Sequence, residues 1–176
     1  MYELRAICPI KKGEQIFLAY IDILQARSNR QEKLRSSYGF TCGCPCCSLP
    51  PSESARSDVC RNVLSNDWAT RKVDDDSALK AWVKDTSLPD DYLIAEDMKF
   101  INIMAVREGY VDDDICKLHY PRLVKAYCAL KDAENAKLWA KRAALIFTAS
   151  DGEDYGWNKV ADSPELTEWW GLREKT

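Results

Sequence analysis

AYCALKDAENAKLWAKRAA, residues 126–144, is the most informative segment for the architecture of this chain. It contains neither glycine nor proline, and its apolar residues recur at helical spacing on both sides of Lys131-Asp132-Ala133. This pattern predicts two antiparallel helices, residues 120–130 and 134–149, joined by a short turn. A single hairpin of this kind cannot bury its own apolar faces, so we expect it to stack on helices that precede it.

The placement of small residues in this segment resembles a tetratricopeptide unit, in which alanines let two antiparallel helices approach closely. Upstream, residues 58–88 predict two short helices, and a further helix follows from Pro89 to the stop signal at Gly109. We expect its apolar face to carry Ile94, Met98, Ile101 and Ala105. Downstream, residues 163–173 predict a capped helix whose Trp169 and Trp170 pack onto the bundle. The fold class is therefore mostly α, with a helical domain over residues 58–176.

Composition excludes several classes of function. The 176 residues include 25 Lys and Arg against 28 Asp and Glu, a net charge of −3, so no general positive field attracts nucleic acid. No apolar run is long enough to cross a bilayer, and the first residues do not resemble a signal peptide. We expect no membrane partner, no direct nucleic-acid binding, and an intracellular location, nuclear or cytoplasmic or both.

Cysteines are concentrated in one place, Cys42-Gly-Cys44-Pro-Cys46-Cys47. Thiolates at these offsets can surround one tetrahedral ion, and zinc suits sulfur ligands. Crowding disfavours two adjacent cysteines on one ion, so we expect Cys42, Cys44 and Cys47 to be the ligands. The alternative is a set of buried or redox-labile thiols without metal.

A fourth ligand has no convincing candidate by spacing. The other cysteines are scattered along the chain, and the single histidine, His119, lies inside an expected helix. We interpret His119 as a hydrogen-bonded core imidazole. The remaining candidates are Cys8, Cys60, Cys116 and Cys128.

The first residues read as a β-hairpin. Residues 2–8 alternate between apolar and polar side chains, and the run Ile16-Phe17-Leu18-Ala19-Tyr20 follows a turn at Lys12-Gly13. Residues 24–37 are polar and basic, which is typical of a short helix whose positive charges face water. The Pro- and Ser-rich residues 50–57 indicate a linker.

Two segments in this order resemble a known family. LRAICPIKKGEQIFLAYID, residues 4–22, and SSYGFTCGCPCCSL, residues 36–49, resemble the end of a SET domain and its post-SET zinc knuckle, as found in SET- and MYND-domain protein-lysine methyltransferases and their fungal relatives. The resemblance implies the C-terminal end of a SET domain over residues 1–37 and a post-SET zinc knuckle over 38–49. The tetratricopeptide-like helical domain then follows the linker.

The resemblance also implies roles for individual residues. Tyr20 corresponds to the tyrosine whose hydroxyl lines the reaction centre, and Tyr38 and Phe40 correspond to aromatics of the target-lysine channel near the cofactor. A lysine amine has an ordinary pKa of about 10.4, and methyl transfer from S-adenosylmethionine needs the neutral amine, so a desolvating aromatic channel suits this chemistry. The implied zinc ligands are Cys42, Cys44 and Cys47.

Parts of the family pattern are missing from these residues. No two glycines are separated by a single residue, and no Asn-His-Ser-Cys segment occurs, although the resemblance places cofactor contacts and the fourth zinc ligand there. We therefore expect the C-terminal part of a protein-lysine methyltransferase, inactive as an isolated chain. Its substrate would be a lysine-containing protein, with a histone tail as one candidate. The alternatives are a non-catalytic helical module that binds a peptide or protein, and a zinc-stabilised interaction domain.

Overall fold

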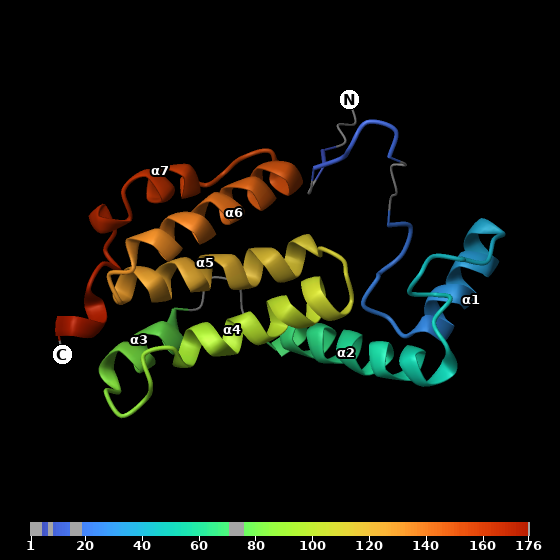
Figure 1. Cartoon of the computed structure of the whole chain (residues 1–176), viewed down its shortest axis with the longest axis horizontal. Helices are drawn as coiled ribbons and strands as arrows, with labels where there is room; N and C mark the ends of the chain where they lie inside the picture. The colour runs from blue at the N-terminus through green and yellow to red at the C-terminus, as the bar shows by residue number, and fades with distance from the viewer. Residues whose placement is uncertain (1–4, 7–8, 15–18, 71–75, 176) are drawn as a thin grey trace.

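The computed structural model describes residues 5–6, 9–14, 19–70 and 76–175, and helices dominate this part of the chain. The elements are α1 (Arg27–Tyr38), α2 (Pro51–Thr70), α3 (Ser77–Lys84), α4 (Tyr92–Asn102), the π-helical turn η1 (Ile103–Arg107), α5 (Asp113–Ala129), α6 (Ala133–Asp151), α7 (Trp157–Asp162) and the short 3-10 helices η2 (Pro164–Leu166) and η3 (Leu172–Lys175). In Figure 1, α5 lies at the centre, with α6 and α7 on one side and α2, α3 and α4 on the other. Helix α1 stands apart, beyond the first turns of α2.

The predicted helical hairpin is confirmed as α5 and α6. The turn between them places Lys131 in the left-handed region, with φ 58°, and the Asp132 side chain accepts a hydrogen bond from Asn135 N at 3.0 Å. This carboxylate satisfies a backbone donor that the first turn of α6 would otherwise leave unpaired. Ala136 and Ala140 are fully buried, so the small residues let the two helices pack closely.

Helix α5 begins earlier than the sequence pattern predicts. We expected a start at Tyr120, just before Pro121, but the helix begins at Asp113 and continues through the proline. An interior proline costs about 3 kcal/mol in an isolated helix. Here Asp112 caps the first turn by accepting from Ile115 N at 3.0 Å, and Ile115 is fully buried. Capping and burial therefore outweigh the local preference against the proline.

The helix expected to end at Gly109 is also confirmed, with a change of phase near its end. Helix α4 passes into the π-turn η1, which rotates the following residues around the axis. As a result Met104 is fully buried, whereas Ala105, which we expected on the apolar face, is exposed.

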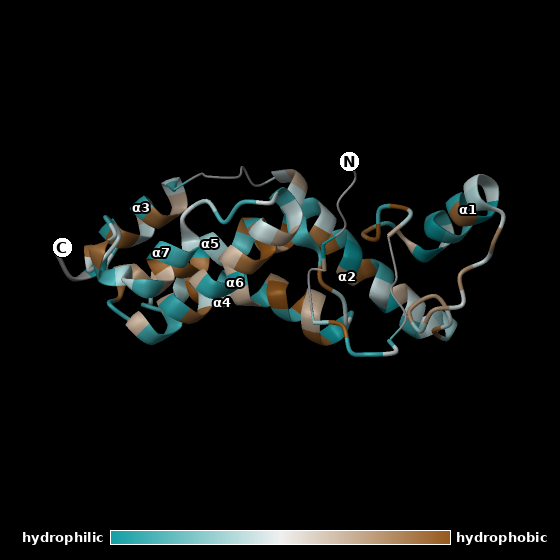
Figure 2. Cartoon of the chain, turned by 90° about the horizontal axis from the view of Figure 1, so that it is seen from above, coloured by the Kyte–Doolittle hydropathy of each residue, from teal (hydrophilic) through white to brown (hydrophobic). Residues whose placement is uncertain are grey.

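The hydrophobic core lies between the helices from α2 onward. Buried apolar residues gather where α5 meets α6, where α2 and α4 meet α5, and where α3 meets α4 and α5. Trp169 and Trp170 pack against the first of these clusters, as predicted, although residues 163–173 form short 3-10 turns instead of one helix. Figure 2 shows α1 as mostly hydrophilic, whereas apolar residues recur along the helices of the bundle.

Two expectations for the N-terminal third need correction. Helix α2 begins at Pro51, so residues 51–57 form helical turns and not the irregular linker we expected. Helix α1 forms as expected, but Arg30 is buried and does not lie on a wet face. The domain boundaries at residues 37, 49 and 57 stay predictions.

The β-hairpin is not shown. No strand occurs among the described residues, and residues 1–4, 7–8 and 15–18, which carry most of its expected pattern, lie outside the described part of the chain. Tyr20, at the end of the expected second strand, is described and lies in irregular backbone.

Candidate functional site

Three cysteine sulfurs converge after α1. The Sγ atoms of Cys42, Cys44 and Cys47 all lie within 4.8 Å of one another. Tetrahedral zinc, with Zn–S bonds of about 2.3 Å, separates its sulfur ligands by roughly 3.8 Å. The spacing and the soft thiolate donors therefore fit a zinc ion with small adjustments, and they leave one coordination position for a fourth ligand.

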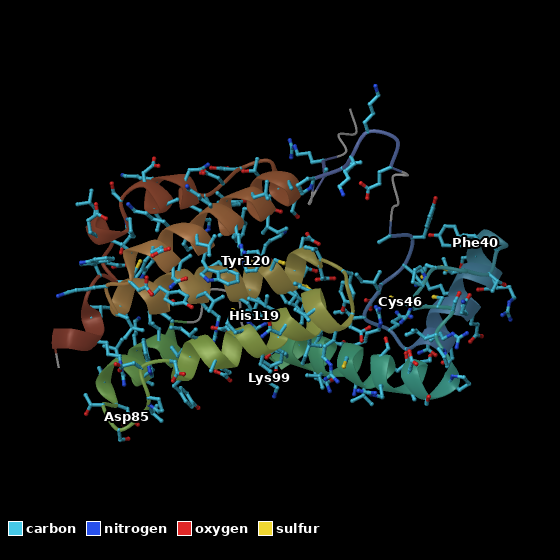
Figure 3. All side chains as sticks on the ribbon, viewed as in Figure 1. Phe40, Cys46, Asp85, Lys99, His119 and Tyr120 are labelled. Atoms are coloured by element: carbon cyan, nitrogen blue, oxygen red, sulfur yellow. The ribbon has the colours of Figure 1, made fainter. Side chains whose placement is uncertain are left out.

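Cys46 is directed elsewhere, as the crowding argument requires. Its thiol donates to the carbonyl oxygen of Glu108 at 3.6 Å, on the C-terminal side of η1. The backbone turn between the ligands is closed by Ser48, whose N–H donates to Cys44 O at 3.0 Å and whose hydroxyl donates to Gly43 O at 3.1 Å. Figure 3 places Cys46 near the α1 end of the molecule, between Phe40 and the helical bundle.

The scattered cysteines do not extend this cluster. Cys60, Cys116 and Cys128 are buried in helices of the bundle. Burial raises the pKa of Cys116 to about 12 and that of Cys128 to about 11, which disfavours the thiolate form that a metal requires. Cys8 lies outside the described residues.

Helix α1 holds the first and last cysteines of the cluster. The Gln31 amide donates through Nε2 to Cys42 O at 2.7 Å, and its Oε1 accepts from Cys42 N at 3.0 Å. One residue before Gln31, Arg30 donates through Nη2 to Cys47 Sγ at 3.9 Å. Sequence reasoning missed both residues, because a polar, basic helix gives no periodic signal for which side chains turn inward.

The thiols of the cluster have different electrostatic environments. Burial raises the pKa of Cys47, and the neighbouring thiols add to this effect, although the hydrogen bond from Arg30 opposes it. At Cys44 burial acts in the same upward direction, but hydrogen bonds from the backbone of Cys47 and from the Cys42 side chain outweigh it and lower the pKa. Cys44 thus becomes a thiolate more readily than Cys47 in the absence of metal.

Three aromatic side chains gather together, and two of them, Tyr38 and Phe40, come directly before the cysteines in the sequence. The Tyr20 ring lies 5.2 Å from the Tyr38 ring and 6.0 Å from the Phe40 ring, both in edge-on geometry. The Tyr38 hydroxyl donates to the Tyr20 carbonyl oxygen at 3.0 Å. All three side chains are exposed, and no described residue hydrogen-bonds the Tyr20 hydroxyl. The structure therefore brings together the three residues that the sequence comparison with SET domains singled out, while their roles stay predictions.

Charged residues connect this region to the helical bundle. The backbone N–H of Arg27 donates to Asp58 Oδ1 at 2.7 Å, and the Arg61 guanidinium donates to the carbonyl oxygen of Ile23. Arg61 also forms a buried ion pair with Glu108 at 3.2 Å. These bonds fix the segment before α1 against α2 and the end of η1. The sequence offered no signal for them, because they join residues far apart in the chain.

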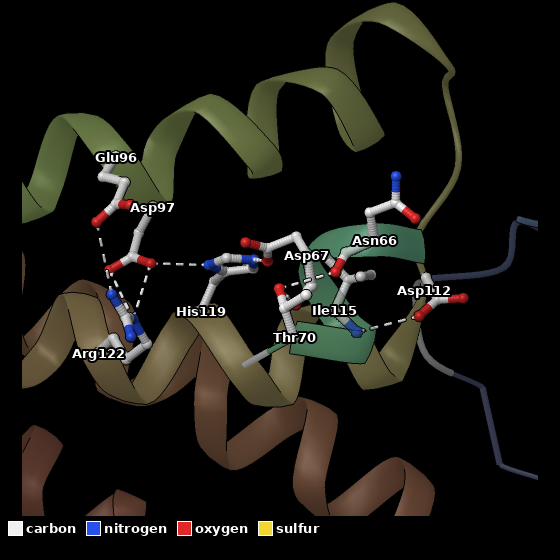
Figure 4. Close-up of polar contacts among 9 residues, drawn as sticks. All are labelled: Asn66, Asp67, Thr70, Glu96, Asp97, Asp112, Ile115, His119 and Arg122. Atoms are coloured by element: carbon white, nitrogen blue, oxygen red, sulfur yellow. Dashed lines mark hydrogen bonds and ion pairs between the residues drawn. The ribbon is translucent and has the colours of Figure 1, made fainter. Parts of the chain in front are cut away.

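His119 lies in the core of the bundle, as expected, and Figure 4 shows it between Asp97 and Asp67. Its Nδ1 is 2.8 Å from Asp97 Oδ1 and its Nε2 is 3.1 Å from Asp67 Oδ2, and the Phe100 ring stacks on it at 5.0 Å. Burial lowers the pKa of His119, but the two carboxylates outweigh burial and raise it. Arg122 Nε adds a second bond to Asp97 at 2.9 Å, so the network joins α2, α4 and α5.

Comparisons with known proteins show a local similarity. N-lysine methyltransferase SMYD2 of Homo sapiens is 40% identical over 57 residues, which is 32% of this chain and 13% of that protein. The chain is locally similar to protein N-lysine methyltransferases. SMYD2 of Gallus gallus is 39% identical over 80 residues, 35% of this chain and 18% of that protein, and SMYD2-A of Xenopus laevis is 37% identical over 57 residues, 32% of this chain and 13% of that protein.

The similarity is confined to a part of each protein. The matches span less than a fifth of the length of these methyltransferases. No family model matches the chain, and no solved structure matches it. Among the helices of the described residues, none has the length and apolar character that a bilayer crossing requires. The local similarity supports a relationship to N-lysine methyltransferases.

Proposed function

We propose that this chain supplies the target-lysine side of a SET-type protein-lysine N-methyltransferase. The observation that carries the proposal is the cluster of Tyr20, Tyr38 and Phe40, because Tyr38 and Phe40 directly precede three convergent cysteines in the sequence. The local similarity to N-lysine methyltransferases supports the same assignment. Residues 1–37 would be the C-terminal end of a SET domain, residues 38–49 its post-SET knuckle, and residues 58–176 a tetratricopeptide-like domain.

The aromatic side chains would form the walls that receive a lysine. Their rings contact the methylene groups of the lysine side chain and exclude water, which lowers the pKa of its amine. The Tyr20 side chain is exposed, and no described residue hydrogen-bonds its hydroxyl. This hydroxyl would accept a hydrogen bond from the amine and hold the amine in line with the methyl donor. Because the Tyr38 hydroxyl is already bonded to Tyr20 O, Tyr38 would act through its ring and by fixing the Tyr20 backbone.

The group transferred would come from S-adenosylmethionine, which supplies an electrophilic methyl sulfonium when bound. The residues of this chain would position the nucleophile and exclude water around it. The substrate class is a lysine-bearing protein segment, of which an exposed basic tail such as that of a histone is one example. Such a protein would act in the nucleus, the cytoplasm or both.

Zinc would keep these walls in place. Bound by Cys42, Cys44 and Cys47, the ion would fix the segment that follows Tyr38 and Phe40, because metal binding is coupled to folding in small cysteine-rich modules. The fourth ligand would come from outside the described cluster.

Titration of the isotope-labelled chain with a single-lysine peptide tests the lysine side of the proposal. We expect the ring resonances of Tyr20, Tyr38 and Phe40 to shift, and a control peptide with norleucine in place of lysine to leave them unchanged. Calorimetry with S-adenosylmethionine should show no binding to these residues alone. Peptide-induced shifts that avoid all three rings would contradict the assignment.

A further inference from the structure

Arg30 is a buried cation that has no carboxylate partner among the described residues. Only 5% of its surface is exposed. Within the described part of the chain, no Asp or Glu forms an ion pair with it. Its guanidinium donates to Gln25 O and to Cys47 Sγ.

A buried charge of this kind needs a counter-charge. Removing a guanidinium from water costs several kcal/mol unless an anion and hydrogen bonds compensate. One carbonyl oxygen is a partial charge and supplies only part of this compensation. The remaining contact of the guanidinium is the sulfur of Cys47, at 3.9 Å.

The cysteine cluster would carry the missing negative charge once it holds a metal. A divalent ion with three thiolates has a net charge of about −1, and an anionic fourth ligand makes it about −2. Arg30 reaches this cluster from α1, on the side of Cys47, the most buried of the three cysteines. The charge of Arg30 and that of the metal-loaded cluster are therefore complementary across one short contact.

We propose that Arg30 is the counter-charge of the metal–thiolate cluster and a positioning residue for Cys47. This inference rests on the proposed zinc site. Gln31 complements Arg30, because it fixes the backbone of Cys42 while Arg30 holds the sulfur at the other end of the cluster. Helix α1 thus sets the separation of the first and last ligands, and Arg30 stabilises the bound state electrostatically.

The test is the zinc affinity of the whole chain, measured by competition with a chromophoric chelator. Arg30→Gln keeps donor groups but removes the charge, and we expect it to weaken zinc binding about 10- to 100-fold, the range for residues that support metal ligands. Arg30→Lys keeps the charge and should recover most of the affinity. Arg35→Gln is the matched control, since Arg35 lies on the exposed face of α1, and it should bind zinc as the wild type does.

The outcomes separate this inference from the proposed function. Zinc binding by Arg30→Gln at wild-type strength would overturn the role of Arg30 and leave the zinc site standing. A loss in Arg30→Lys equal to that in Arg30→Gln would also overturn it, because the charge would then make no difference. Absence of zinc binding by the wild-type chain would refute the zinc site and this inference with it. Circular dichroism of each variant should show unchanged helix content, because α2 to α7 do not depend on Arg30.

Discussion

Each cysteine between residues 42 and 47 has a distinct environment, although the residues are adjacent in sequence. Cys42 is held through its backbone by Gln31, Cys47 through its sulfur by Arg30, and Cys46 bonds to Glu108 across the junction with the bundle. Whether a cysteine of this segment can bind a metal therefore depends on where its thiol points, and not only on its being a cysteine.

Serine substitutions test this distinction. Cys47→Ser removes a convergent sulfur and should abolish stoichiometric zinc binding, whereas Cys46→Ser should leave the zinc content unchanged, because Cys46 Sγ faces Glu108 O. Metal analysis by atomic emission after exhaustive dialysis measures both. Equal zinc content in the two variants would refute the assignment of ligands.

The metal candidates could be predicted from sequence, but their supporting residues could not. Crowding between adjacent cysteines is a local constraint that the sequence shows. The structure agrees with it, because the Cys47 sulfur lies in the cluster and the Cys46 sulfur faces Glu108 O. Arg30 and Gln31 contact the cysteines because the segment after Tyr38 folds back against α1. The sequence of α1 has no periodic pattern that predicts this contact. The same holds for Arg61 and Glu108, whose ion pair joins residues 47 positions apart.

At the scale of elements, the α5–α6 hairpin depends on its capping residue. Asp132 accepts from the backbone N–H of Asn135 at 3.0 Å and from its Nδ2 at 2.7 Å. Asp132→Ala should lower the free energy of unfolding by about 1 kcal/mol, because a helix start loses its cap. Asp132→Asn keeps an acceptor and should cost only a fraction of that, as urea denaturation would show. Equal losses in the two variants would mean that the cap is not the cause.

The contact of α2 with α4 and α5 includes a histidine whose pKa is raised by two carboxylates. His119 lies between Asp67 and Asp97, and its raised pKa means that the charged imidazole is the form stabilised by folding. The stabilisation is fully present below the unfolded pKa of about 6.5 and is lost as the pH rises through the higher folded value. We expect the free energy of unfolding to fall as the pH rises above neutrality.

His119→Gln identifies the source of this pH dependence. The variant should be less stable by about 3 kcal/mol at low pH, because it removes a cation that two buried carboxylates contact. It should also lose the alkaline decrease in stability, measured by urea denaturation from pH 6 to 9. An alkaline decrease of the same size in wild type and variant would contradict the role of His119.

Element boundaries were predictable where caps and turns act locally, and not where tertiary contacts override them. The turn predicted at residues 131–133, which the structure has at residues 130–132, and the stop at Gly109 follow from local chemistry. The passage of α5 through Pro121 follows from burial of the residues before it, and the π-turn η1 follows from packing that buries Met104. Residues 51–57 are helical despite their Pro- and Ser-rich composition, and the buried Ser57 hydroxyl donates to Glu108 Oε2, a partner far away in the sequence.

At the scale of the whole molecule, the metal region and the bundle have separate sources of stability. The apolar clusters lie between α2 and the C-terminal segment, while residues 27–49 depend on Gln31, Arg30 and the cysteines. A chelator should therefore expose residues 19–49 to protease and leave a stable fragment that includes α3 to α7. Limited proteolysis with and without added zinc measures this. Global unfolding on chelation, or no change at all, would contradict the division.

The most direct test of the central claim is methyl transfer by a fusion. The chain would follow the part of Homo sapiens N-lysine methyltransferase SMYD2 that precedes the segment matched here, so that both sides of the reaction centre are present. We predict transfer of a labelled methyl group from S-adenosylmethionine to a lysine peptide, with a loss of at least about 10-fold in Tyr20→Phe, because that variant lacks the positioning hydroxyl. A folded, cofactor-binding fusion that transfers no methyl group, or one that Tyr20→Phe leaves unchanged, would contradict the account.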